Sequence, residues 1–198
     1  MKGKRIVSGL FVIAIYILFA VLLFCAINKK MNFHVDEIYS YGLANHTADG
    51  EKNMSIENGI KYIPADFPWQ QYTTVSYDNR FNYKSVFENQ KVDTHPPLYY
   101  CALHTICSFF PERFSKWYAG IVNIFFMLLS LMAYRKILDM YFNSIFSKNI
   151  LSVIFVITPA FINETMFLRM YPMTMYIVLM TMYAFVKLIR GGTAIERI

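Results

Sequence analysis

Residues Ile6–Ile27 read IVSGLFVIAIYILFAVLLFCAI, which is 22 consecutive positions without a charged side chain. A helix of that length crosses the roughly 30 Å hydrocarbon core of a bilayer. A secretory signal peptide also begins with a basic flank such as Met-Lys-Gly-Lys-Arg, but its apolar core is shorter and a small-x-small cleavage site follows it. Neither feature is found before Asn28, so residues 1–27 are predicted to be an uncleaved first transmembrane helix with a basic, cytoplasmic N-terminus.

The composition of the whole chain agrees with a membrane protein. Of its 198 residues, 56% are hydrophobic and only 16% are charged, whereas soluble domains carry about 25% charged residues. That balance argues against a disordered chain, a coiled coil and an ordinary cytosolic enzyme. The net charge of +6 comes mostly from bases at the ends of apolar runs, a pattern typical of membrane orientation and not of a nucleic-acid surface. We therefore expect a lipid bilayer as a partner and no nucleic acid.

Three further apolar runs follow in the second half of the chain. Trp117–Tyr134 has 18 uncharged residues and Met170–Val186 has 17, so both are predicted to span the membrane. Ile150–Ile162 is shorter and must borrow flanking residues to cross. We therefore assign three further transmembrane helices to residues 112–190, and a tail to residues 191–198.

The segment over residues 96–111 is also apolar, and the distribution of charge bears on whether it crosses. If it lies on the membrane surface, short cytoplasmic segments carry nine basic residues and short outer segments carry three; if it crosses, the counts are six and six. The positive-inside rule favours the surface location. Tyr100, His104 and Ser108 recur every four residues as a polar stripe, as expected of an interfacial helix. The nine cytoplasmic bases are Lys2, Lys4, Arg5, Arg135, Lys136, Lys148, Lys187, Arg190 and Arg197, and the three outer ones are Arg113, Lys116 and Arg169.

The expected fold is an all-α integral membrane protein with about four transmembrane helices and a large extracytoplasmic loop that carries short membrane-surface helices. The loop, residues 28–95, holds nine of the 13 acidic and seven of the 19 basic residues, so it is locally acidic at −2. Under this topology the loop and the short segment at 163–169 share the outer face, where their polar residues can meet. A fifth span would put Arg169 on the opposite side.

Two polar clusters near the ends of apolar runs are candidates for chemistry. Asp36 and Glu37 follow the first span by a few residues, and adjacent carboxylates near a low-dielectric boundary suit a general base. The alternative is that Asp36 is the N-cap of a short helix with Glu37 in its first turn. In the second cluster, two prolines fix the backbone just after His95. His95 is then either a site residue or a polar boundary beside an aromatic belt that includes Tyr99.

A third cluster lies at the start of the last span. Arg169 with Tyr171 nearby can hold a phosphate, and the alternative is a snorkelling anchor. A dedicated metal site is not expected, because the His and acidic residues follow neither HxH nor HExxH spacing. A divalent metal bound by part of this set is the alternative. The metal-capable residues are His34, Asp36, Glu37, His46 and His95.

The order of these elements resembles the N-terminal part of the GT-C membrane glycosyltransferases. The pattern is one span, Asp-Glu, a long outer loop, His-Pro-Pro-Leu-Tyr-Tyr at 95–100, further spans, then Arg-Met-Tyr at 169–171. It is most similar to the branch with protein O-mannosyltransferases, aminoarabinose transferases and bacterial family-39-like proteins. The resemblance runs from Ile6 to Ile189, nearly the whole chain. The resemblance depends on His-Pro-Pro-Leu-Tyr-Tyr at this position and on the order of all the motifs together.

The resemblance implies a polyprenyl-phosphate-linked sugar as donor and a hydroxyl group of a lipid, glycan or protein as acceptor, used on the extracytoplasmic face of a plasma membrane, which the composition suggests is bacterial. Asp36 would then be the base that removes the acceptor's proton, and Glu37 would help shape the site. His95 would lie at the floor of the site, and Arg169 would neutralise the lipid phosphate. A phosphate leaving group needs a cation and a hydroxyl nucleophile needs a base, so the chemistry is consistent. Tyr99, Glu164 and Tyr171 complete the expected substrate-binding set.

The sequence departs from the family pattern in two ways. Relatives place an acid near the Arg motif, as in Gln-Glu-Ala-Arg-Met-Tyr, whereas here the nearest acid, Glu164, is five residues upstream of Arg169. Family members are several hundred residues long, so the chain is expected to be a fragment. Two other classes stay open: a non-catalytic membrane protein that binds lipid-linked sugar or scaffolds an envelope complex, and a small transporter or channel subunit. The latter predicts charges inside the spans, which the uncharged runs do not have.

Overall fold

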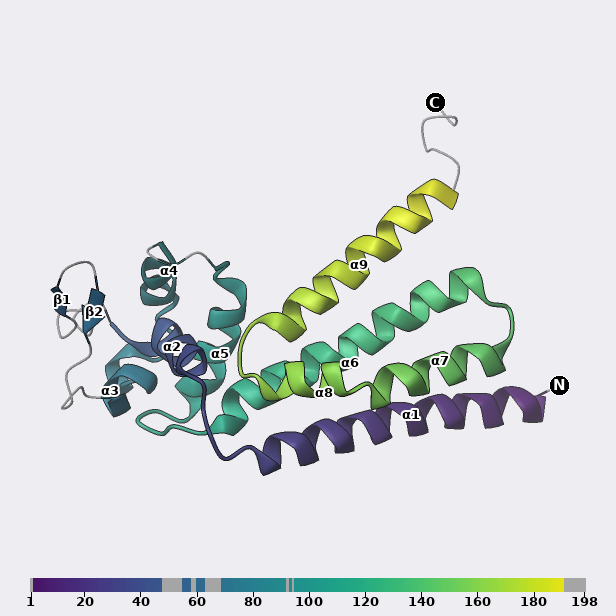
Figure 1. Cartoon of the computed structure of the whole chain (residues 1–198), viewed down its shortest axis with the longest axis horizontal. Coiled ribbons are helices and arrows are strands. Elements are labelled where there is room, and N and C mark those ends of the chain that lie inside the picture. The colour runs from purple at the N-terminus through teal and green to yellow at the C-terminus, as the bar shows by residue number, and fades with distance from the viewer. Residues whose placement is uncertain are drawn as a thin grey trace. The chain divides into compact units, whose positions relative to one another are not determined.

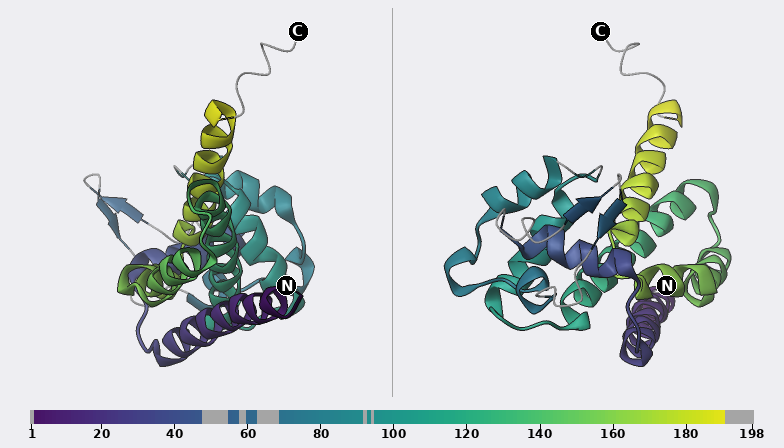
Figure 2. Two further views of the ribbon diagram at one scale, coloured as in Figure 1. Left: turned by 90° about the vertical axis from the view of Figure 1, so that its right-hand side faces the viewer. Right: turned by 60° about the vertical axis from the view of Figure 1, so that its left-hand side comes forward.

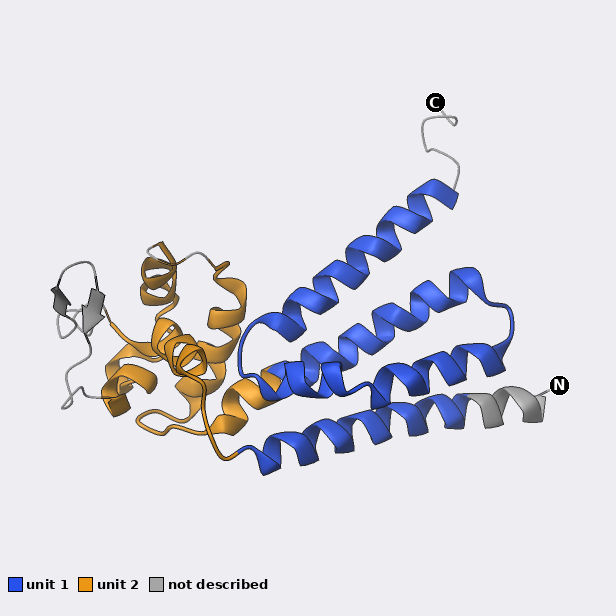
Figure 3. Ribbon diagram, in the orientation of Figure 1, with its two compact units in different colours: residues 1–30, 123–198 blue, residues 31–122 orange. Residues whose placement is uncertain are grey.

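The structure is a computed structural model, drawn in Figure 1 and from two further sides in Figure 2. It describes residues 2–47, 55–57, 60–62, 69–91, 93 and 95–190, and among them the side chains of 9–47, 69–91, 93 and 95–190. The chain divides into two compact units: unit 1 holds residues 1–30 and 123–198, and unit 2 holds residues 31–122 (Figure 3). The predicted tail at 191–198 lies outside the described residues.

Unit 1 is built from long apolar helices. Three described helices are long and apolar enough to cross a membrane: α1 (Lys2–Lys29), with its apolar stretch from Gly9 onward, α6 (Lys116–Tyr141) and α9 (Tyr171–Arg190). The uncharged runs over 6–27, 117–134 and 170–186 therefore do form spanning-length helices, and the chain is of the membrane class. Its helical character comes from these runs, because a helix satisfies every backbone polar group internally.

The predicted span over 150–162, the third in the chain, is a bent pair of helices. α7 (Ile145–Ile157) and α8 (Pro159–Met166) meet at an angle of 47°. Pro159 has no amide hydrogen to continue the helix, and it forces Thr158 into extended backbone with ψ 119°. The Thr158 hydroxyl turns back to donate to the Ile154 carbonyl at 2.7 Å. The expected single helix over 150–162 is therefore broken, and it borrows residues on both sides.

The core of unit 1 lies where α1 packs against α7 and α8. Phe19 is completely buried and meets the ring of Phe155 edge-on, with ring centroids 5.9 Å apart. Such edge-to-face pairs add to the stabilisation that burial alone supplies. The buried members of this core are Ile15, Phe19, Leu23, Met127, Leu131, Phe155 and Val156.

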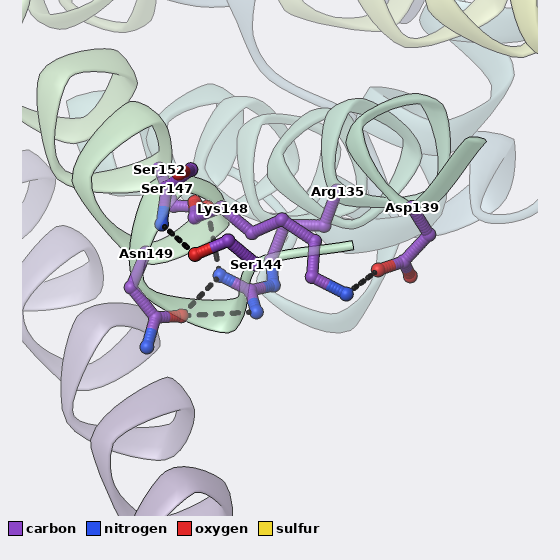
Figure 4. Close-up of polar contacts among 7 residues, drawn as sticks. All are labelled: Arg135, Asp139, Ser144, Ser147, Lys148, Asn149 and Ser152. Carbon is purple, nitrogen blue, oxygen red and sulfur yellow. Dashed lines mark hydrogen bonds and ion pairs between the residues drawn. The ribbon is translucent and has the colours of Figure 1, made fainter. Parts of the chain in front are cut away.

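One end of unit 1, where α6 turns into α7, is held by a polar cluster (Figure 4). The Arg135 guanidinium donates to Ser152 Oγ at 2.7 Å and to Asn149 Oδ1 at 3.2 Å. Lys148 pairs with Asp139 at 2.6 Å. These contacts join the last turns of α6 to the first turns of α7 and fix the hairpin between them. We call this end of the unit the α6–α7 end.

The opposite end of unit 1 is where α8 leads into α9. Figure 1 shows α1 running alongside α7 and α8, so that Lys29 lies at this second end, the α8–α9 end. The C-terminal half of α9 returns to the first end: its Tyr183 ring lies under Lys136 of α6, and its Arg190 lies over the ring of Tyr141. The α6–α7 end therefore gathers Arg135, Lys136, Lys148, Lys187 and Arg190.

Unit 2 is a set of short helices around α2 (Val35–Asn45), which packs against α3 (Trp69–Thr73), α4 (Tyr83–Lys91) and α5 (Leu98–Phe109). A 3₁₀ turn, η2 (Tyr77–Asn79), precedes α4. The described residues also include an antiparallel strand pair, β1 (Ser55–Glu57) and β2 (Ile60–Tyr62), with Ser55 opposite Tyr62. Short helices were predicted between 28 and 95; the strand pair was not.

The helix α5 corresponds to the predicted membrane-surface segment at 96–111. Its 12 residues are too few to span a bilayer. The predicted polar stripe does not face outward, because Tyr100, His104 and Ser108 are all completely buried. Apolar Leu98 and Phe109 are instead exposed. The stripe packs against the protein interior, and the outer face of the helix is apolar.

Candidate functional site

The predicted site residues fall into two groups, one in each unit. Asp36, Glu37, His95 and Tyr99 belong to unit 2, where they lie at the starts of α2 and α5. Glu164, Arg169 and Tyr171 belong to unit 1, where α8 leads into α9.

The first turn of α2 is organised by a capping box. His34 is the N-cap; its side chain accepts from the Asp36 N–H at 3.3 Å, and Glu37 Oε2 accepts from the His34 N–H at 2.6 Å. This pattern satisfies backbone donors that a helix start otherwise leaves without partners. The alternative that Asp36 is the N-cap is therefore wrong, because His34 is, although Glu37 does lie in the first turn. Glu37 is completely buried, and its carboxylate holds the turn together.

Asp36 occupies the second position of α2, and the cap does not depend on its carboxylate. The side chain is 39% exposed, and its Oδ2 lies 3.7 Å from His34 Nδ1. A helix N-terminus favours negative charge at this position. The arrangement presents a partly accessible carboxylate on a rigid helical turn, which is what a hydroxyl-activating base requires.

His95 is oriented by a neighbour that sequence reasoning missed. Its Nδ1 lies 2.8 Å from Oδ2 of Asp93, and the two side chains are 26% and 22% exposed. A carboxylate on one ring nitrogen fixes the orientation of an imidazole. The signal was present in the sequence, since Asp93 is two residues before His95.

Tyr99 lies deeper than expected. Both Tyr99 and Tyr100 are completely buried, with their rings edge-on at 5.7 Å. An aromatic belt at a membrane surface needs exposed rings, so that alternative is wrong for this pair. The two rings, which belong to α5, instead lie in the interior of unit 2.

The segment between α8 and α9 is held by a second residue that sequence reasoning missed. Asn123 donates from Nδ2 to the carbonyls of Thr165, at 3.1 Å, and Phe167, at 2.9 Å. Both carbonyls lie at the C-terminal end of α8, where helical partners are lacking. Asn123 is completely buried, so its two hydrogen bonds stabilise this segment more than hydrogen bonds at the surface would. It fixes the backbone that leads into Arg169.

Arg169 is 9% exposed, and its guanidinium lies 5.7 Å from the centre of the Tyr171 ring. A snorkelling arginine extends its head group into water, and this one does not. Tyr171 is stacked on Phe167, with ring centroids 5.7 Å apart. The arrangement supplies a preorganised cation next to an aromatic hydroxyl, which suits an anionic ligand. Glu164 lies on the exposed side of α8.

A metal centre needs several ligand side chains close together. Among the residues that the structure describes, no group of three or more His, Cys, Asp or Glu side chains is arranged to hold a metal ion.

The interior of unit 2 contains an ionisable group with a shifted pKa. His104 of α5 is completely buried, with the ring of Tyr83 at 5.7 Å. Burial lowers the pKa of His104 below 6.5, and the backbone carbonyls of Ala44 and Asn79 oppose the shift by favouring the charged ring. The neutral ring is thus the form that the folded unit accommodates.

We expect His104 to make the chain less stable in acid. Below pH 6.5 the unfolded chain binds a proton at this residue that the folded chain does not, so stability is full above pH 6.5 and falls as the pH drops. The slope from one such group is at most about 1.4 kcal/mol per pH unit. Thermal unfolding at pH 7.5 and pH 5.5 measures it. His104→Gln should have a smaller difference between the two pH values than the wild-type chain; an equal difference would exclude this residue as the cause.

Comparisons with protein-family models, with curated proteins and with solved structures find no match for this chain.

Proposed function

We propose that the protein acts in the transfer of a sugar from a polyprenyl-phosphate donor to an acceptor hydroxyl, on the extracytoplasmic side of the membrane. The motif order Asp-Glu, His-Pro-Pro-Leu-Tyr-Tyr and Arg-Met-Tyr motivates the reaction class. The observation that carries the proposal is internal to unit 1: the C-terminal end of α1 and the Arg169 segment lie at the same end (Figure 1).

This shared end supports one compartment for the base and the cation. The first stretch of unit 1 ends at Lys30, and Asp36 follows six positions later. Six residues of extended chain reach at most about 20 Å. If the helices of unit 1 cross a membrane, Asp36 and Arg169 therefore emerge from it on the same side. Among the residues whose side chains the structure describes, five bases gather at the other end, against one acid, Asp139. The positive-inside rule assigns that basic end to the cytoplasm.

The proposed reaction uses two charged groups in complementary roles. The Asp36 carboxylate accepts the proton of the acceptor hydroxyl as its oxygen attacks the anomeric carbon of the donor. The bond from that carbon to the phosphate oxygen breaks, and the polyprenyl phosphate leaves with the electron pair. Arg169 stabilises the negative charge that builds up on the phosphate. Glu37 stabilises the helical turn that carries Asp36. The hydrogen-bonded pair of His95 and Asp93 offers a second oriented polar group.

The shared compartment is tested by cysteine labelling in intact cells. The background variant replaces Cys25 and Cys101; Cys107 can stay, because burial raises the pKa of its thiol to about 12 and keeps it unreactive. Single cysteines are then introduced at exposed Met31 and Asn163, near the two site segments, and at exposed Asn143, at the α6–α7 end.

A membrane-impermeant maleimide should label positions 31 and 163 from outside, and position 143 only after permeabilisation. Labelling of positions 31 and 163 from opposite sides would end the proposal.

The role of Arg169 is tested by replacing it in the native gene product. Arg169→Gln should reduce transfer from a labelled sugar on polyprenyl phosphate about 10- to 100-fold, since a charge-assisted contact to the phosphate is lost. Arg169→Lys keeps the charge and should retain part of the activity. Lys84→Gln, on exposed α4, is the control and should be neutral. Donor binding without any turnover in the wild-type protein would favour a non-catalytic lipid-sugar binder instead.

A further inference from the structure

Unit 2 contains a polar cavity of about 640 Å³ at the C-terminal end of α2. It lies between that helix end, the first turn of α3 with the loop after it, and the turn between α5 and α6. Asp36 lies in the first turn of the same helix that Asn45 ends, so the cavity is at the other end of α2 from the proposed base. Its size is within the range of ordinary small-molecule pockets. The lining residues are Asn45, Thr47, Gln70, Gln71, Thr74, Ser76 and Glu112.

The chemistry of this lining is uniform. Six of the seven residues are neutral amides or hydroxyls, and the seventh, Glu112, is a carboxylate; none of these described lining residues is a lysine or an arginine. Amides and hydroxyls both donate and accept hydrogen bonds, and a carboxylate accepts two at once. Among these described lining residues, a phosphate or other anion would meet no cation and one negative charge. The lining instead matches a neutral ligand with many hydroxyl groups.

Two features fix the walls of the cavity. Asn45 is 2% exposed and donates from Nδ2 to the Thr73 carbonyl at 2.7 Å, so its amide is held at the inner wall. Glu112 has φ 58°, a left-handed conformation that a residue with a side chain rarely adopts.

Glu112 is held in that conformation by contacts from the other walls. Its N–H donates to the Val75 carbonyl at 2.8 Å, and Gln70 Nε2 lies 3.5 Å from its carbonyl oxygen. The turn is therefore tied to the α3 side of the cavity. Its carboxylate is kept at the wall despite the unfavourable backbone.

We propose that this cavity binds a neutral saccharide through Gln71, Ser76 and Glu112, with the Asn45 amide at its wall. The site lies at the other end of α2 from Asp36, and binding there needs neither the donor nor turnover. A failure of saccharide binding at this cavity would therefore not contradict the proposed transfer reaction. A failure of the transfer reaction would likewise not contradict saccharide binding at this cavity.

Binding is tested by ligand-observed saturation-transfer NMR on the full chain in lipid nanodiscs, since many detergents carry sugar head groups. The probes are glucose, methyl mannoside, N-acetylglucosamine and maltose, with inorganic phosphate and tetraglycine as comparison ligands. At least one sugar should bind with a dissociation constant in the millimolar range, as expected of a small ligand in an open pocket. Tetraglycine should give no saturation transfer, and added phosphate, which has no observable protons, should leave the saturation transfer to the sugar unchanged.

Variants assign the binding to this cavity. Gln71→Ala removes one neutral hydrogen-bonding group and should weaken binding about 3- to 10-fold. Glu112→Gln keeps the size and the backbone and should weaken it about 10-fold or more, because bonds to a charged group are stronger. Glu88→Gln, an exposed carboxylate on α4 that pairs with Lys84, is the matched control and should leave binding unchanged.

Three results would overturn the inference. The first is that no probe sugar binds, while thermal unfolding shows the chain to be folded. The second is that a sugar binds with equal strength to Gln71→Ala, Glu112→Gln and Glu88→Gln. The third is that phosphate or tetraglycine competes with the sugar, since neither fits the chemistry of the lining.

Discussion

Replacing Asp36 with Asn is expected to lower the rate of sugar transfer about 100- to 10,000-fold, the range by which general base catalysis accelerates such steps. Asn has nearly the same shape as Asp but cannot accept a proton from the acceptor hydroxyl. The fold should survive, because the first turn of α2 is capped by His34 and Glu37. The loss should therefore be in kcat and not in the amount of folded protein in the membrane.

The measurement is transfer of labelled sugar by membranes that contain the native gene product, with protein amount determined by quantitative immunoblotting. Asp78→Asn is the matched control: the same substitution at an exposed acid of η2, in the same unit. It should leave transfer unchanged. If Asp36→Asn and Asp78→Asn transfer sugar equally well, Asp36 is not the base.

The spans were predictable because each rests on a single local property. An uncharged run of 17 to 22 residues has to be helical in lipid, and no distant contact changes that. The bend within the third run was also readable, since Thr158-Pro159 interrupts the helix wherever it lies. The bend was not predicted, because the length and the hydropathy of the apolar run at 150–162 do not take account of the missing backbone N–H of proline.

The direction of α5 could not be predicted from its pattern. A stripe of Tyr100, His104 and Ser108 on an apolar helix fits either a polar face toward water or a polar face toward a protein interior. The choice depends on what α2 and α4 offer to it. The Ser108 carbonyl accepts from the side chain of Arg80, and its hydroxyl accepts from the Phe81 N–H at 3.0 Å, so the turn before α4 supplies partners for this member of the stripe.

The candidate site shows the same division between local and distant information. Asp36 and His95 were found as members of short motifs, and the capping by His34 was missed because histidine is an unusual N-cap. Asn123 was missed because its two partner carbonyls lie more than 40 residues away in sequence. The polar cavity of unit 2 combines residues from 45 to 112, which no spacing rule connects.

Gly42→Val should give the largest loss of stability among single substitutions in unit 2. A Cβ at position 42 would lie 1.9 to 2.4 Å from ring atoms of Tyr72, where Cβ atoms are essentially never found. Tyr72 is 6% exposed, and its ring is confined by His46 at 5.1 Å and Trp69 at 6.2 Å. Because the ring is buried between these neighbours, we expect α2 and α3 to move apart, at a cost of about 3 kcal/mol or more.

Thermal unfolding of the chain in nanodiscs tests this, with Gly9→Val as the matched control. A Cβ at position 9 of α1 would meet no atom within 4 Å, so the same substitution there should be close to neutral. The cause is isolated by a double-mutant cycle with Tyr72→Ala, which removes the obstructing ring. In that background Gly42→Val should cost far less than in the wild-type chain. An additive cycle, or equal midpoints for Gly42→Val and Gly9→Val, would show that the contact of α2 with α3 at Gly42 does not limit the stability of unit 2.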